Sequence, residues 1–124
     1  MLHSKRTFGS LIKELRLKNT EYSLRKLAEI VGISPAYLSR LEAEKDPPPS
    51  EEIIIKMSKI LEADKDELLS CADKVSPDIL RIIKKNPRSV PSFLRLAGEK
   101  GLSEKDWDRV SRFVETEDLG KKRR

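Results

Sequence analysis

Residues 23–42, with the sequence SLRKLAEIVGISPAYLSRLE, constrain the fold of this chain more than any other segment. Ser23 stands where a helix N-cap belongs, and apolar residues then recur at the spacing of one helix face. Gly32 can end this helix, because glycine takes the left-handed conformation at no steric cost. Ser34 can cap the next helix, with Pro35 at the first position, where no amide hydrogen is needed. The segment therefore predicts two short helices that meet at a sharp turn.

Similar signals predict helices on both sides of this pair. From Phe8 to Leu15, apolar residues follow the i, i+3, i+4, i+7 pattern of an amphipathic helix. After the three prolines of KDPPPSEE, which cannot continue a helix, Ser50 can cap a fourth helix, and ADKDELLS predicts a short fifth one. No stretch alternates with period two, so strands are not expected. We therefore expect an all-α fold, with a five-helix domain over residues 5–72.

Residues 74–118 predict a small helical C-terminal extension. SPDILRIIKKNP repeats the Ser–Pro helix start, and VPSFLRLAGEKG predicts a short helix bounded by Pro91 and by the pair Gly98 and Gly101. LSEKDWDRVSRFVE opens with a capping box and carries an apolar stripe. The last residues, 119–124, form a basic tail that we expect to be disordered.

The charge of the chain is unevenly distributed. Residues 5–40 hold eight Lys and Arg against three Asp and Glu, whereas residues 41–71 hold four against nine. The two stretches therefore carry +5 and −5, and the whole chain carries +5. One face of the predicted domain could attract a polyanion while another repels it.

Simple features of the sequence argue against several classes of protein. No apolar run approaches the length of a membrane span, and no signal-peptide pattern opens the chain. His3 is the single histidine, which leaves no histidine-based triad or metal cluster. Cys71 is the single cysteine; it is either a small core residue or a redox sensor, and nothing nearby clearly lowers its pKa. We expect a cytoplasmic protein that is not an enzyme, has no catalytic residues, and uses no metal or cofactor.

The segment 23–42 resembles the helix-turn-helix of the Cro and phage-repressor (XRE) family. The resemblance extends from Phe8 to about Ser70 and implies a five-helix, lambda-repressor-like DNA-binding domain. It also implies a sequence-specific transcriptional regulator, favoured as a dimeric repressor, that inserts helix 34–42 into the major groove of double-stranded DNA. The residues that carry the resemblance are Leu27, Ala28, Gly32, Ile33, Ser34, Ser39, Leu41 and Glu42.

The resemblance also implies which residues face the groove. Pro35 and Ala36 have no side-chain donor, so we expect them to contact thymine methyl groups. Direct readout then depends chiefly on Arg40, because an arginine–guanine pair gives about 1–3 kcal/mol of discrimination. Tyr37 either reaches a phosphate or base edge or lies flat over the protein surface. The expected groove-facing set is Ser34, Pro35, Ala36, Tyr37, Ser39 and Arg40.

Family members grip the phosphate backbone at the start of the second helix, which here carries Ser23, Arg25 and Lys26. The sequence departs from the family there, since Leu24 stands where the family usually has Gln. The loop AEKDPPP offers only Lys45 as a basic group. A weak grip by the monomer would make dimerisation more important for affinity.

The resemblance further implies an ion pair between Arg16, near the end of the first helix, and Glu42, which closes the third. If the pair is buried, it fixes the DNA-reading helix on the bundle, and its loss costs about 3–5 kcal/mol. If it is exposed, it contributes little.

The extension after residue 74 has apolar stripes that need a cover. They either pack back on the domain or form a twofold dimer contact, which would place two half-sites one DNA turn apart. The alternative function is an antitoxin, whose C-terminal helices bind a toxin while the N-terminal domain regulates its own operon. A third possibility is a repressor inactivated by a separate protease that cuts within CADKVSPD. The GKKRR tail either adds phosphate contacts or aids solubility.

Overall fold

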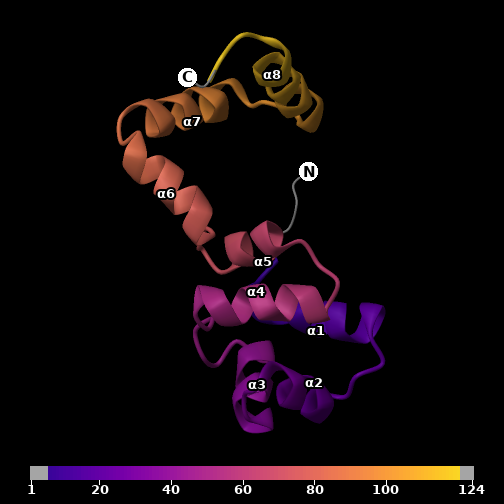
Figure 1. Ribbon diagram of the computed structural model, residues 1–124. Coiled ribbons are helices and arrows are strands. Elements are labelled where there is room, and N and C mark those ends of the chain that lie inside the picture. Colours follow the sequence, from indigo (N-terminus) through magenta and orange to yellow (C-terminus); the bar gives the residue numbers. More distant parts are fainter. Residues whose placement is uncertain (1–5, 121–124) are drawn as a thin grey trace. The chain divides into compact units, whose positions relative to one another are not determined.

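The computed structural model describes residues 6–120, and within them the chain forms helices and no strand (Figure 1). The expected all-α fold is therefore confirmed. By its internal packing the chain divides into two units, Met1–Arg81 and Ile82–Arg124, which are described separately below. The helices in chain order are α1 (Phe8–Asn19), α2 (Leu24–Val31), α3 (Pro35–Glu42), α4 (Glu51–Ile60), α5 (Lys65–Cys71), α6 (Pro77–Lys85), α7 (Ser89–Lys100) and α8 (Glu104–Thr116).

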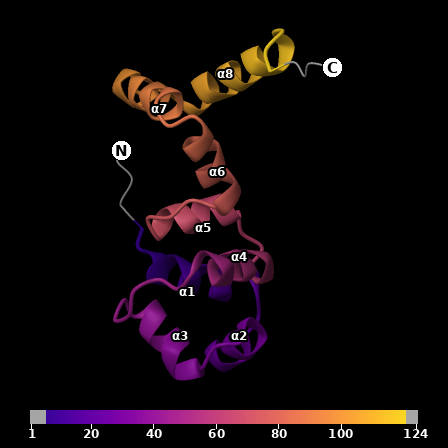
Figure 2. The ribbon, with the colours of Figure 1, turned by 60° about the vertical axis from the view of Figure 1, so that its left-hand side comes forward.

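Helices α1 to α5 enclose one hydrophobic core in the first unit. The α3 helix packs against α1 and α2, while α4 packs against α2 and α5. Figures 1 and 2 show α2 and α3 side by side at the end of this unit opposite α5. Ile12, Leu27 and Leu38, from three different helices, are fully buried. The stripes that predicted the helices thus become the faces that hold them together.

The turn between α2 and α3 follows the capping signals of the sequence. The Ser23 hydroxyl accepts a hydrogen bond from the Lys26 amide at 3.1 Å. Gly32 ends α2 in the left-handed region, with φ of 93°, and its amide donates to the Ala28 carbonyl at 2.8 Å. Ser34 then caps α3 by accepting from the Tyr37 amide at 3.0 Å. These bonds satisfy groups that helix ends leave open, and they set the angle between the two helices.

Helix α1 approaches α3 very closely at Gly9. A Cβ atom placed there would lie 2.2 Å from the Leu41 carbonyl oxygen, which is a backbone atom. The Glu44 carboxylate lies in the same place and accepts from the Ser10 amide at 3.1 Å. Only glycine fits this crossing, a requirement that no sequence pattern had indicated.

The packing boundary falls inside α6, later in the chain than residue 72, where we expected the first domain to end. Ala72 and Ser76, which precede α6, are both buried. The Ser76 hydroxyl donates to the Asp78 carboxylate, and this bond lowers the pKa of Asp78. The chain therefore stays attached to the first unit up to the start of α6.

The second unit contains the end of α6 together with α7 and α8. Helix α7 was expected to be bounded by Pro91 and by the pair Gly98 and Gly101. Gly101 does follow its last residue, but the boundary at Pro91 is wrong: the helix runs from Ser89 to Lys100 and contains both Pro91 and Gly98. Pro91 is tolerated because amides in the first helical turn need no partner within the helix. Gly101, with φ of 66°, ends α7.

Helix α8 begins with the expected capping box. The Ser103 hydroxyl accepts from the Asp106 amide, and the Asp106 carboxylate accepts from the Ser103 amide. The bond from the Ser103 amide lowers the pKa of Asp106. The Phe93 and Trp107 rings meet edge to face, with centroids 6.3 Å apart, and join α7 to α8.

Among residues 6–120, no helix is both long and apolar enough to cross a membrane. The expected disordered tail lies largely outside the described residues, as do His3 and Lys5.

Candidate nucleic-acid interface

Helix α3 presents one face to the core and the opposite face to solvent. Leu38 and Leu41 are buried against α1 and α2. Ala36, Ser39 and Arg40 are exposed on the other side. Pro35 and Tyr37 are half-buried beside them, and Ser34 is exposed at the N-cap. The structure therefore gathers the expected groove-facing residues on one accessible helix face.

The Arg40 guanidinium is held on two sides. Its Nε donates to Oδ2 of Asp46 at 2.9 Å, and the two side chains are 49 % and 27 % exposed. Its central carbon also lies 5.9 Å from the centre of the Tyr37 ring. This distance is typical of a cation–π contact. Tyr37 thus packs partly on the core while supporting the arginine.

Sequence reasoning missed the contact between Arg40 and Asp46. The loop after α3 reverses its direction at Glu44, whose φ is 64°, and the Lys45 amide donates to the Arg40 carbonyl at 2.8 Å. This reversal brings Asp46 back beside the helix. The acidic residue Asp46 soon after the helix was a possible signal for an ion pair with Arg40. The prolines of the loop, however, do not indicate the direction in which the chain turns.

The start of α2 supplies a second group of exposed polar side chains. Arg25 is exposed and, among residues 6–120, its side chain forms no ion pair or hydrogen bond. Nζ of Lys26 lies 3.8 Å from Oε1 of Glu29. This ion pair is exposed, so water and salt screen it and make it weak. Leu24 packs partly against the core, so it takes a structural place rather than a phosphate-binding one. Lys45 is exposed in the loop after α3.

Arg16 and Glu42 form a buried, two-point ion pair. Nε and Nη2 of Arg16 each donate to one oxygen of Glu42 at 2.9 Å, and the side chains are 9 % and 5 % exposed. A third donor, Nη1, bonds the Tyr22 carbonyl at 3.3 Å. The hydrogen bonds to Glu42 raise the pKa of Arg16. The pair fixes the C-terminal end of α3 on α1, the arrangement that the family resemblance implied.

Within residues 6–120, no cluster of His, Cys, Asp and Glu side chains could hold a metal ion. Cys71 is half-buried against the core, and this burial raises the pKa of its thiol. A raised pKa lowers the fraction of reactive thiolate, so the environment favours a packing role for Cys71.

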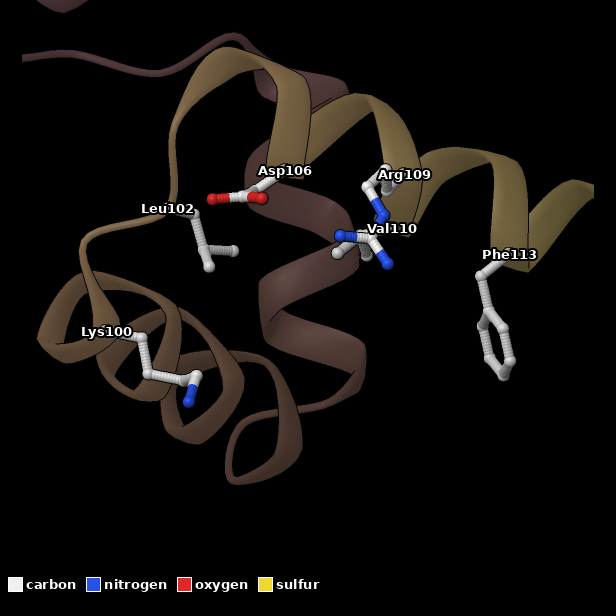
Figure 3. A pocket seen from close by; sticks show the side chains of 6 residues that line it. All are labelled: Lys100, Leu102, Asp106, Arg109, Val110 and Phe113. Carbon is white, nitrogen blue, oxygen red and sulfur yellow. The ribbon is translucent and has the colours of Figure 1, made fainter.

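The second unit presents an open groove along α8 (Figure 3). The Phe113 ring projects from α8 beyond the other labelled side chains, and it is 55 % exposed. Phe93, Leu94, Leu96 and Val114 are also largely exposed in this unit. The residues that line the groove are Lys100, Leu102, Asp106, Arg109, Val110 and Phe113.

Comparisons with known proteins find one family model and similar solved structures. A helix-turn-helix family model matches residues 12–68. The crystal structure of SinR, a master regulator for biofilm formation, in complex with DNA is 35 % identical in sequence. That match covers 51 % of this chain and 98 % of the SinR chain, with a TM-score of 0.47. A SinR–SinI protein complex matches at 24 % identity over 88 % of this chain and 95 % of that chain, with a TM-score of 0.49. Among curated proteins, no sequence matches significantly.

Proposed function

Because this chain belongs to the Cro and phage-repressor (XRE) family of helix-turn-helix transcriptional regulators, we propose that it is a dimeric repressor that inserts α3 into the major groove of DNA. The observation that carries the proposal is the outward face of α3, where Arg40 stands beside the short side chains of Ala36 and Ser39. The buried pair of Arg16 and Glu42 holds this helix rigidly on the bundle. The proposal includes double-stranded DNA as the ligand and the cytoplasm as the location of the protein.

The chemistry of this face favours a particular kind of base recognition. Pro35 and Ala36 offer apolar contact to thymine methyl groups, while Arg40 offers paired donors to guanine O6 and N7. Ser23, Arg25 and Lys26 lie at the start of α2, whose amides and cations suit phosphate oxygens. Phosphate contacts would set the register of the protein on DNA, and Arg40 would supply most of the discrimination between bases.

The test compares Arg40→Ala with Arg25→Ala on a pool of duplexes with a randomised half-site. Arg40→Ala should lose about 1–3 kcal/mol of base preference at one position per half-site while non-specific binding persists. Arg25→Ala, the control, should weaken binding to all sequences equally and lower the salt dependence by about one counterion. An equal loss for all sequences with Arg40→Ala would make Arg40 a phosphate contact and contradict this assignment.

The exposed apolar side chains of the second unit are the argument for dimerisation. Its apolar side chains lie along α7 and α8 with little cover, as at Phe113 and Leu96. A twofold contact between two copies would bury them and place two α3 helices at successive half-sites. Sedimentation of Phe113→Ser should show a shift from dimer towards monomer. The matched control is Leu17→Ser, which replaces another exposed apolar residue, on α1, and should leave the dimer unchanged.

The same exposed surface would serve the alternative function, in which a toxin covers α7 and α8. A protein that sediments as a monomer at all practical concentrations would contradict the dimer and favour a different protein partner. Binding of DNA by that monomer would leave the role of α3 intact.

A further inference from the structure

We propose that Asp46 is a positioning residue that orients Arg40 for base recognition and thereby increases the specificity of α3. The inference rests on the proposed function, because it concerns how the same helix face reads DNA. Its basis is the contact of 2.9 Å between Arg40 Nε and Asp46 Oδ2 in the loop that follows α3.

The contact with Asp46 leaves the two Nη nitrogens of the Arg40 guanidinium available for a base. Asp46 occupies the Nε edge, and the central carbon of the guanidinium lies over the Tyr37 ring, 5.9 Å from the ring centre. Within residues 6–120, the two Nη nitrogens of Arg40 make no hydrogen bond. Those nitrogens form a planar pair of donors, which matches guanine O6 and N7. A free arginine would lose rotamer freedom on binding, whereas this one is already ordered in part.

The negative charge of Asp46 has two effects on DNA binding. A carboxylate at the interface repels phosphates, so it lowers the affinity for DNA of any sequence. An Arg40 side chain that is ordered and partly neutralised by Asp46 is also less able to turn towards the DNA phosphates. Specificity is the ratio of specific to non-specific affinity. The uniform repulsion leaves that ratio unchanged, whereas keeping Arg40 off the phosphates raises it.

A purely structural role for Asp46 has little support in its contacts. Among the described residues its carboxylate bonds to Arg40 and makes no hydrogen bond to the loop backbone. Arg40 is half exposed, and exposed pairs of this kind contribute little to folding stability. The pair can therefore be broken without unfolding the domain, which makes positioning directly testable.

The experiment uses the full chain and a pool of duplexes randomised across the half-site. Base preference is read at the position where Arg40→Ala loses it. Asp46→Ala should lower the guanine preference there by about two- to tenfold, which corresponds to the ordering of one long side chain. Asp46→Asn keeps an oxygen that can accept from Nε, so it should retain most of the preference. Both variants remove one negative charge, so both should bind non-specific DNA more tightly.

Glu21→Gln is the matched control, because it removes an exposed acid from the loop before α2 that does not contact Arg40. It should leave the base preference unchanged. If Asp46→Ala keeps the full preference while Arg40→Ala loses it, the role of Asp46 is overturned and the function stands. If Asp46→Asn loses as much preference as Asp46→Ala, charge alone acts and positioning by the hydrogen bond is wrong. If the unaltered chain shows no base preference, the proposed function fails and the role of Asp46 fails with it.

Discussion

The two units of this protein use similar helices with very different amounts of burial. In the first unit the apolar stripes of α1 to α5 converge on one core, and a buried ion pair joins its first and third helices. In the described part of the second unit, Ala97 is the one apolar residue that is buried. The same amphipathic pattern thus yields a self-sufficient domain in one case and an open surface in the other. A helix that carries an apolar stripe is stable only when something covers the stripe.

Glu42→Ala should have the largest effect on the first unit. It leaves the Arg16 guanidinium buried without its partner, which costs about 3–5 kcal/mol of unfolding free energy. Because α3 would also lose its anchor on α1, specific DNA binding should fall with stability. Denaturant unfolding followed by circular dichroism measures the change.

The control for this prediction is Glu29→Ala, which breaks the exposed pair with Lys26. It should change stability by no more than about 0.5 kcal/mol. If both variants lost the same unfolding free energy, the buried pair of Arg16 and Glu42 would contribute no more than an exposed pair. That result would contradict its role in holding α3 on α1.

A matched pair of leucine substitutions compares the two units directly. Leu38 is fully buried in α3, whereas Leu96 in α7 is 54 % exposed. Leu38→Ala should cost about 2–5 kcal/mol, because it removes buried methyl groups and leaves a cavity. Leu96→Ala should change the stability of the isolated chain by about 0.5 kcal/mol or less and should weaken self-association instead.

Chemical unfolding at low and high protein concentration separates these effects. The loss of unfolding free energy in Leu38→Ala should not depend on protein concentration. The loss in Leu96→Ala should appear only at concentrations where the dimer is populated. A large, concentration-independent loss in Leu96→Ala would mean that the second unit has a core of its own, and the contrast between the units would disappear.

The sequence predicted the parts of the molecule that depend on local chemistry. Capping residues such as Ser23 and Gly32 predicted helix ends correctly, since their effect operates within a few residues. The pair of Arg16 and Glu42 was expected only through the family resemblance, because nothing local links residues so far apart. The contact between Arg40 and Asp46 was missed, since it depends on the path of the intervening loop. Pro91 was misread as a boundary because the first turn of a helix accepts proline.

Substituting glycine by alanine should have opposite effects on stability in the two units. Gly9→Ala forces a Cβ against the Leu41 carbonyl where α1 crosses α3, and it should destabilise the first unit by about 1–3 kcal/mol. Gly98→Ala adds a Cβ on α7 with nothing within 4 Å, so it should stabilise that helix by up to about 1 kcal/mol. Thermal unfolding of both variants, with helix-resolved NMR signals, measures the two changes. A destabilising Gly98→Ala that is relieved by dilution would place Gly98 in the dimer contact, because the added methyl group would then clash with the partner rather than with the chain itself.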